Sequence, residues 1–140
     1  MLNIPLAKEA LKKAGLRLTK QRNLILEILS NNYNHPTAED LIVEIEKRTG
    51  HVTVATVYNT LEVLSKQNII KKIDGLEAKN HYDPNIKPHY HAICVECKKI
   101  YDLEINEKFL NLPESFQLKD CLIQGLCKSC KNKELGEKNV

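Results

Sequence analysis

The chain has 140 residues, of which 42% are hydrophobic and 28% charged, a mixture typical of a folded globular protein and not of a disordered one. Its first residues lack the apolar run of a signal peptide, and no stretch approaches the roughly 18 consecutive apolar residues of a membrane helix, so we expect a cytoplasmic protein. The net charge of +3 is too small to indicate a nucleic-acid partner by itself.

The positive charge is concentrated at the start of the chain. Residues 1–31 contain six basic and two acidic side chains, a local charge of +4. A basic surface of this kind attracts the phosphate backbone of DNA. A solvated helix face has the same composition, however, so charge alone leaves both interpretations open.

Residues 5–82 have the pattern of four helices followed by a β-hairpin. Thr19 is placed to cap the second helix, and Thr37 with Asp40 fits a capping box at the start of the third. Gly50 is expected to end that third helix.

The fourth helix is expected over residues 53–66. Its apolar positions recur at helical spacing and are predicted to face the core: Val54, Val57, Leu61 and Leu64. Two β-prone segments follow, 69–73 and 79–82, around the turn-forming pair Asp74-Gly75, with a loop longer than two residues. Helices and a hairpin in this order are typical of a winged helix-turn-helix, whose second motif helix enters the major groove of DNA.

The opposite face of residues 53–66 is polar and carries Thr56, Tyr58, Asn59 and Glu62. Asn pairs bidentately with adenine, Thr contacts the thymine methyl group, and Tyr reaches a phosphate or a base edge. These side chains predict DNA binding. The alternatives are that they are ordinary exposed helix residues, or that the winged helix binds another protein.

Beyond a proline-bracketed linker at residues 84–88, helical stripes give way to short strands. The sequence predicts three strands, near residues 90–95, 99–103 and 117–124, and a possible helix over 104–111. The tail from residue 131 onward is polar and expected to be frayed.

Four of the five cysteines form two Cys-x-x-Cys pairs, Cys94 with Cys97 and Cys127 with Cys130. Thiolates are soft anionic ligands, and four of them satisfy tetrahedral zinc with no open position. We therefore predict a structural zinc site. A redox pair is disfavoured because a thioredoxin-like motif needs a βαβ setting. Cys121 has no such mate and is expected to be a core cysteine on a strand.

A second metal site is predicted around His89 and His91. In an extended segment these residues point to the same face. Asp83 precedes them, Asp102 lies on the next expected strand, and His35 is far away in sequence. Imidazoles combined with carboxylates suit iron, manganese or zinc. The alternative is a pair of solvated histidines beside a hinge.

Two further histidines, His51 and His81, have no such context. The first lies near the start of the fourth helix and the second in the expected hairpin. We predict no functional role for either.

Four segments resemble the ferric uptake regulator (Fur) family: residues 15–22 (GLRLTKQR), 35–40 (HPTAED), 54–59 (VATVYN) and 89–97 (HYHAICVEC). The resemblance extends from about Lys8 to Cys130 and is greatest to the family's peroxide-responsive repressor (PerR) branch. It implies a dimeric winged-helix repressor that binds palindromic operator DNA.

The resemblance also implies a regulatory Fe²⁺ or Mn²⁺ site. Its five ligands would be the residues that match the family's pattern: His35, Asp83, His89, His91 and Asp102. Family members with Asp at the last of these positions tend to sense peroxide, whereas iron-uptake members tend to carry Glu.

Three positions match residues through which the family binds DNA or distinguishes its branches. Arg17 falls where the family places a basic residue that probes the minor groove, and Tyr58 at its DNA-contacting tyrosine. Asn59 follows the peroxide-responsive pattern, where many iron regulators have Arg. With Thr56, these residues are the predicted DNA contacts.

The sequence thus predicts an α+β protein with a winged-helix DNA-binding domain (1–83), a hinge (84–88) and a small α/β dimerisation and metal-binding domain (89–140) containing a four-cysteine zinc site. Its predicted function is that of a metal-dependent repressor, not an enzyme, that senses peroxide through iron-catalysed oxidation of a ligand histidine. Three alternatives stay open: an iron- or manganese-responsive regulator of the same family, a mononuclear metal enzyme that uses the His/Asp cluster, and a zinc-ribbon interaction module without a DNA role.

Overall fold

A computed structural model describes residues 2–31, 34–87 and 89–138. The chain divides into two compact units, Met1–Ile86 and Lys87–Val140. Of the predicted hinge, Pro88 lies outside the described residues. Among the described residues, no helix combines the length and the apolar content that crossing a bilayer requires.

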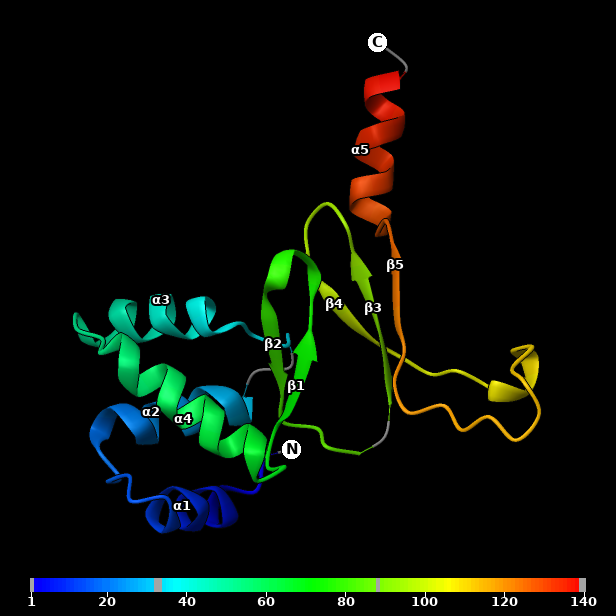
Figure 1. The fold of residues 1–140 in the computed structure, drawn as a ribbon. Helices are drawn as coiled ribbons and strands as arrows, with labels where there is room; N and C mark the ends of the chain where they lie inside the picture. Colours follow the sequence, from blue (N-terminus) through cyan, green and yellow to red (C-terminus); the bar gives the residue numbers. More distant parts are fainter. Residues whose placement is uncertain (1, 32–33, 88, 139–140) are drawn as a thin grey trace. The chain divides into compact units, whose positions relative to one another are not determined.

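The first unit contains four helices and a hairpin, in the predicted order (Figure 1). The elements are α1 (Ile4–Lys13), α2 (Lys20–Asn31), α3 (Ala38–Thr49), α4 (Val54–Lys66), β1 (Lys71–Asp74) and β2 (Asn80–Asp83). The strands β1 and β2 pair antiparallel and form the wing. This arrangement confirms the predicted fold class for the helical part of the chain.

Local signals in the sequence fix the ends of the helices. The Thr19 hydroxyl accepts a hydrogen bond from the Arg22 main-chain N–H at the start of α2. At the start of α3, Thr37 and Asp40 make both hydrogen bonds of a capping box. Gly50 ends α3 with a φ of 74°, in the left-handed region that glycine adopts without strain.

The core of this unit is built around α4, which packs against α1, α2 and α3. Its buried residues are Val57, Thr60, Leu61 and Leu64. The prediction that Val54 is buried is wrong, because half of this residue is exposed. Val54 begins the helix, one turn before the stripe that contacts the neighbouring helices, and the buried position goes to Thr60, whose hydroxyl donates to the Thr56 carbonyl.

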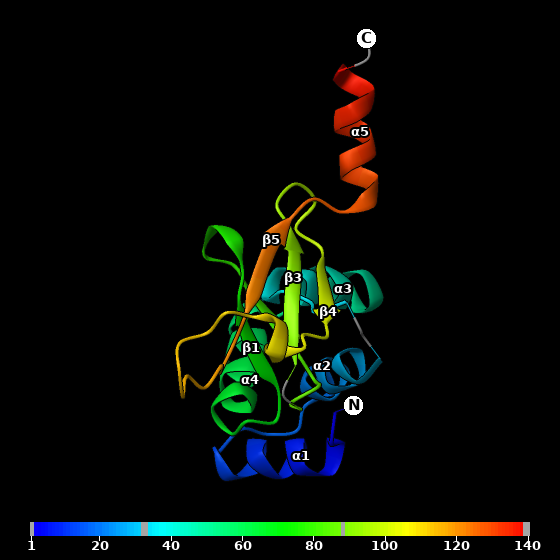
Figure 2. The same cartoon turned by 90° about the vertical axis from the view of Figure 1, so that its right-hand side faces the viewer.

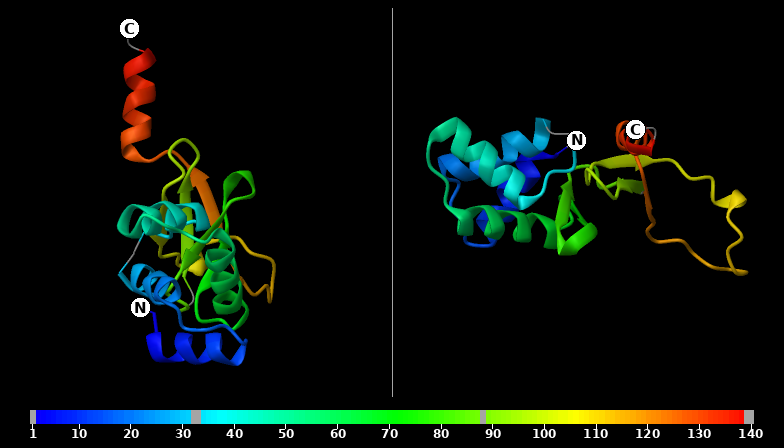
Figure 3. Two further views of the ribbon diagram at one scale, coloured as in Figure 1. Left: turned by 90° about the vertical axis from the view of Figure 1, so that its left-hand side faces the viewer. Right: turned by 90° about the horizontal axis from the view of Figure 1, so that it is seen from above.

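The second unit contains a three-stranded sheet in the order β4-β3-β5 (Figure 2). Its strands are β3 (Tyr90–Cys94), β4 (Ile100–Leu103) and β5 (Leu122–Gly125). The central strand β3 pairs antiparallel with β4 and parallel with β5. Because parallel strands need a long connection, a loop extends away from the strands between β4 and β5 (Figure 3, right).

Three expectations for this unit need correction. The strand predicted over 117–124 is confined to β5, whose four residues are those in register with β3. The helix predicted over 104–111 is reduced to a single 3-10 turn, η2 (Glu107–Phe109). The tail predicted to be frayed forms a helix, α5 (Lys128–Lys138), which leaves the sheet after β5 (Figure 3, left). The tail sequence does not indicate this helix by pattern because it has no apolar stripe, although Lys, Glu and Leu all have good helix propensity.

Candidate metal centres and nucleic-acid interface

The two Cys-x-x-Cys pairs meet at one end of the sheet in the second unit. Cys94 ends β3 and Cys97 lies in the turn that follows, while Cys127 and Cys130 lie at the start of α5. The parallel register places Cys94 opposite Gly125, so β5 delivers the second pair beside the first. The four Sγ atoms all lie within 4.8 Å of one another, and those of Cys97 and Cys127 are 3.9 Å apart.

The protonation of these thiols depends on their neighbours. Main-chain N–H groups, first that of Cys127, donate to the Cys94 sulfur and lower its pKa to about 6. The thiol of Cys130 donates to the Cys127 thiolate, which raises the pKa of Cys130 to about 12. Four sulfur atoms this close together therefore cannot all ionise unless a cation compensates their charge.

The donor set fits zinc. A tetrahedral ion with Zn–S bonds of about 2.3 Å separates its sulfur ligands by about 3.8 Å, close to the 3.9 Å between Cys97 and Cys127. Four thiolates leave no open position, so the site suits a structural ion. Zinc would supply folding free energy here and no chemical step.

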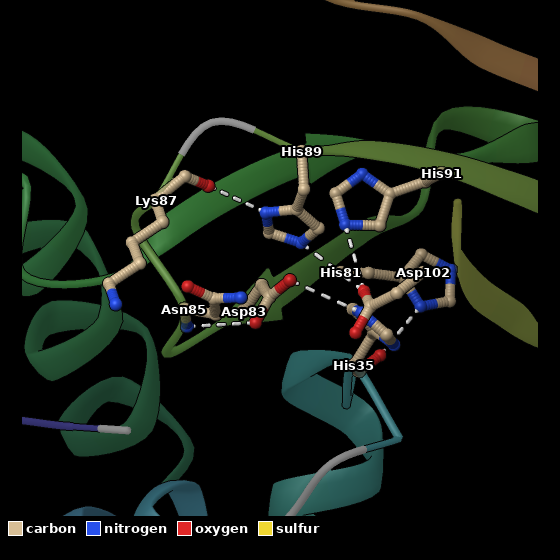
Figure 4. A network of polar contacts seen from close by, with 8 residues as sticks. All are labelled: His35, His81, Asp83, Asn85, Lys87, His89, His91 and Asp102. Atoms are coloured by element: carbon tan, nitrogen blue, oxygen red, sulfur yellow. Dashed lines mark hydrogen bonds and ion pairs between the residues drawn. The ribbon is translucent and has the colours of Figure 1, made fainter. Parts of the chain in front are cut away.

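A histidine–aspartate pair is buried in the first unit. The Nε2 atom of His35, which precedes α3, lies 3.2 Å from Oδ2 of Asp83, the last residue of β2 (Figure 4). The side chains are 4% and 7% exposed. The main-chain N–H of Asn85 donates to the other carboxylate oxygen of Asp83, so this carboxylate has a fixed orientation.

The second unit contains two histidines and an aspartate. The Nε2 atoms of His89 and His91 lie 3.2 and 3.5 Å from one carboxylate oxygen of Asp102. The β3–β4 register causes this arrangement, because it places His91 directly opposite Asp102. His89 donates from Nδ1 to the Lys87 carbonyl at 2.6 Å, so Nε2 is the unprotonated nitrogen of the neutral ring, the kind of nitrogen that binds metals.

The predicted DNA-binding residues lie in the first unit. Arg17, Tyr58 and Asn59 are exposed, and Thr56 is half-buried. The Tyr58 hydroxyl donates to the Glu39 carboxylate at 3.0 Å, which raises the pKa of the tyrosine. The Arg17 carbonyl accepts from the Arg22 side chain, so the main chain at Arg17 is held while its own side chain faces solvent.

His81 and Cys121 both differ from what the sequence predicts for them. His81, for which no role was predicted, is buried in β2, and its Nδ1 atom lies 2.8 Å from the His35 carbonyl oxygen. No local motif marks this contact, which joins residues 46 positions apart. The prediction that Cys121 is a core cysteine on a strand is wrong, because this residue is half-buried and lies just before β5, where its carbonyl accepts from the His91 N–H.

A winged helix-turn-helix unit, a four-thiolate site and a separate set of histidines and aspartates define the class of metal-dependent DNA-binding regulators. A sequence model of the ferric uptake regulator family matches residues 13–121. The peroxide operon regulator of Bacillus subtilis (strain 168) is 36% identical over 135 residues, covering 91% of this chain and 93% of that protein. The peroxide-responsive repressor PerR of Staphylococcus epidermidis is 33% identical, with coverages of 87% and 86%.

Solved structures show the same fold. The ferric uptake regulator Fur of Helicobacter pylori matches with a TM-score of 0.74 and 23% identity over 91% of each chain. Fur of Vibrio cholerae matches with a TM-score of 0.66 and 23% identity over 86% of this chain and 98% of that one. The chain therefore belongs to the ferric uptake regulator family of transcriptional regulators, as its sequence motifs predict.

Proposed function

We propose that this protein is a metal-dependent transcriptional repressor that responds to peroxide. In this proposal residues 1–83 bind operator DNA, residues 84–88 form a hinge, and residues 89–140 form the dimer and hold zinc at the four cysteines. Large apolar side chains exposed in the second unit support the dimerisation role, because a subunit interface would remove them from water; they include Phe109, Phe116 and Ile123.

The observation that carries the proposal is the division of the oxygen and nitrogen donors between the two units. His35 and Asp83 belong to one, and His89, His91 and Asp102 to the other. One Fe²⁺ or Mn²⁺ ion that takes both sets as ligands would favour a single arrangement of the units. A dimer would then present its two α4 helices at the spacing of a palindromic operator.

Binding of metal and binding of DNA are expected to strengthen each other. An ion that binds one arrangement better than another shifts the protein toward it, and the coupling is reciprocal. Arg17, Thr56, Tyr58 and Asn59 are the proposed DNA contacts. Tyr58→Ala and Arg17→Ala should each cost about 1–3 kcal/mol of operator binding, with unchanged zinc content.

Oxidation of a ligand histidine is the proposed response to peroxide. A ferrous ion held by the five proposed ligands would supply one electron to hydrogen peroxide, which would give hydroxide and a hydroxyl radical and leave the iron ferric. The imidazole of His35 or of His89 would take up the oxygen. His35 lies beside Asp83, and His89 lies beside Asp102. The hydroxyl radical would add to the ring, and the adduct would then give one electron to the ferric ion and one proton to the hydroxide. In net terms, histidine and hydrogen peroxide give an oxidised histidine and water with the iron returned to the ferrous state, and the altered ring is a poorer ligand.

The test compares operator binding by the Fe²⁺ and Mn²⁺ forms before and after peroxide, with mass spectrometry of the peptides that contain His35 and His89. The Fe²⁺ form should gain one oxygen on one of these peptides and release DNA, whereas the Mn²⁺ form should do neither. If the Fe²⁺ form stays unmodified on the DNA with its iron retained, the protein is an iron- or manganese-responsive regulator of the same family.

Asp102 gives a sharper version of this test. Asp102→Glu keeps the charge and the ligand type, so metal-dependent DNA binding should persist while the peroxide response weakens. Asp102→Ala removes a ligand and should lose most of the activation by metal. An undiminished peroxide response in Asp102→Glu would contradict the proposed role of the shorter carboxylate.

A further inference from the structure

The backbone at His35 is held in an uncommon conformation. Its φ is 53°, in the left-handed region that a non-glycine residue adopts only where its surroundings enforce it. The residue precedes the capping box of α3, and its side chain is buried. Contacts from other parts of the chain are therefore needed to stabilise the backbone of His35 in this conformation.

The wing strand β2 supplies these contacts. The Nδ1 atom of His81 lies 2.8 Å from the His35 carbonyl oxygen, and because a carbonyl only accepts, this nitrogen carries the proton. The Tyr82 main-chain N–H donates to the Pro36 carbonyl at 2.9 Å. Thr37 forms an isolated antiparallel bridge with His81. Three successive residues, 35–37, are thus hydrogen-bonded to or paired with β2.

The same strand also contacts the side chain of His35. Asp83, two residues after His81 on β2, places its carboxylate 3.2 Å from the imidazole of His35. Figure 4 shows His81 beside the main chain of His35 and Asp83 beside its ring. One strand therefore fixes both the backbone and the side chain of this histidine.

The wing leaves a fitted space for the His81 ring. A Cβ atom at Gly75, in the loop between β1 and β2, would lie 2.7 Å from Cδ2 of His81. Gly75 has a φ of −88°, which any residue adopts, so left-handed backbone does not explain the glycine. A Cβ atom there would meet the Lys79 carbonyl oxygen at 2.8 Å as well as the His81 ring, and these two contacts together leave no room for a side chain. The His81 side chain is 7% exposed, so its hydrogen bond is shielded from water.

We propose that His81 is a positioning residue that fixes the backbone of His35 and thereby couples a regulatory metal ion to the wing hairpin. The proposal rests on the proposed function, in which His35 and Asp83 are ligands. A metal that holds the imidazole of His35 also stabilises the carbonyl that His81 contacts, and with it β2. By reciprocity, a wing held in place on DNA keeps His35 ready to bind the metal.

A matched pair of substitutions in the full-length zinc-loaded protein isolates the hydrogen bond. His81→Asn keeps a nitrogen donor attached to Cγ, whereas His81→Leu has nearly the same shape as Asn and no donor. Loss of one buried hydrogen bond should weaken Mn²⁺ binding about fivefold to tenfold in His81→Leu, with recovery toward wild type in His81→Asn. His51→Leu, at an exposed histidine of the same unit, should bind Mn²⁺ like the wild type.

Hydrogen exchange supplies the measurement that a merely structural role would not alter. Mn²⁺ should slow exchange of the Tyr82 amide and of the β1–β2 amides in wild type and His81→Asn, and much less in His81→Leu. If His81→Leu matches wild type in both Mn²⁺ affinity and Mn²⁺-induced protection, the inference is overturned while the proposed function stands. If His81→Leu does not fold, hydrogen exchange of the wild-type protein alone tests the coupling. A Tyr82 amide that exchanges at the same rate with and without saturating Mn²⁺ overturns it.

The two proposals fail in different ways. Wild-type protein that neither binds Mn²⁺ nor changes its DNA affinity with Mn²⁺ would remove the proposed function, and the role of His81 with it. Wild-type protein that responds to Mn²⁺ without any change in the wing would remove the role of His81 only.

Discussion

The two units of this chain are built in different ways. Residues 1–86 bury a continuous apolar cluster from four helices and the start of the wing. Among the described residues of the second unit, the buried apolar side chains are Ile93, Cys94 and Ile100. Small units with so little buried apolar surface need a metal, a disulfide or a partner to fold. The first unit therefore derives its stability from apolar burial, whereas the second is expected to depend on the zinc that its four cysteines would hold and on the dimer.

Removing a zinc ligand should have the largest effect on this contrast. Structural zinc contributes about 10–16 kcal/mol of binding free energy in zinc-finger peptides. The few buried apolar side chains of the second unit cannot replace a contribution of that size. Cys94→Ser should lose zinc and dimer together while the helical circular dichroism of the first unit persists. Metal analysis, native mass and thermal melting report these changes.

Cys121→Ser is the control for that variant, since Cys121 stands outside the four-thiolate group. It should retain zinc and the dimer. A zinc-free Cys94→Ser protein with an unchanged melting profile would show that the second unit does not depend on the metal.

Truncating a side chain of the apolar core should instead destabilise the first unit and leave the zinc site of the second unit intact. Leu64 is fully buried in α4, so Leu64→Ala should cost about 2–5 kcal/mol in the free energy of unfolding of the first unit, with zinc content unchanged. Val54→Ala, at the exposed start of the same helix, should stay within about 0.5 kcal/mol of wild type. Denaturant titration with a helical signal distinguishes the two, and equal losses would contradict the described core.

The cap of α3 should contribute less than a core leucine. Thr37→Ala removes the hydroxyl that accepts from Asp40 and should cost about 1 kcal/mol. Thr53 occupies the corresponding position of α4 but makes no side-chain cap hydrogen bond. Thr53→Ala should therefore be nearly neutral in the same denaturant titration, and a larger loss there than at Thr37 would contradict the capping geometry.

The smallest expected effect is a pH dependence at Glu39. Its pKa lies below the usual 4.5, first because its own main-chain N–H donates to the carboxylate and also because Tyr58 does. A lowered folded-state pKa stabilises the protein above pH 4.5 and loses that contribution as the pH falls through the folded value. The carboxylate is exposed, so the gain is below about 1 kcal/mol.

Glu39→Gln removes this titration. The difference in stability between wild type and the variant should be greatest near neutral pH and shrink in acid, as measured by urea titrations from acid to neutral pH. A difference that grows as the pH falls has the wrong sign for a stabilising carboxylate.

Local sequence signals anticipated part of this structure. The capping box at Thr37 and the glycine end of α3 are confirmed because their geometry depends on neighbouring residues. The four cysteines were also predictable as a set, because each pair forms one turn and two pairs satisfy one ion.

Features that depend on long-range register were missed. The contact of His81 with the His35 carbonyl depends on the pairing of β2 with the segment before α3, where Thr37 bridges to His81, and no local pattern encodes that pairing. The burial of Thr60 in place of Val54 depends on where the neighbouring helices contact α4. Helical periodicity predicts which face of a helix is apolar, but it does not predict at which residue along that face burial begins.

The central claim is that zinc builds the second unit while a different metal controls DNA binding. The most direct test titrates Mn²⁺ into zinc-loaded protein and measures its affinity for operator DNA, beside His89→Ala with its zinc intact. Wild type should gain at least about tenfold in affinity, equivalent to about 1.4 kcal/mol, and His89→Ala should gain little. Operator affinity that is the same with and without Mn²⁺ in the zinc-loaded wild type would contradict the account.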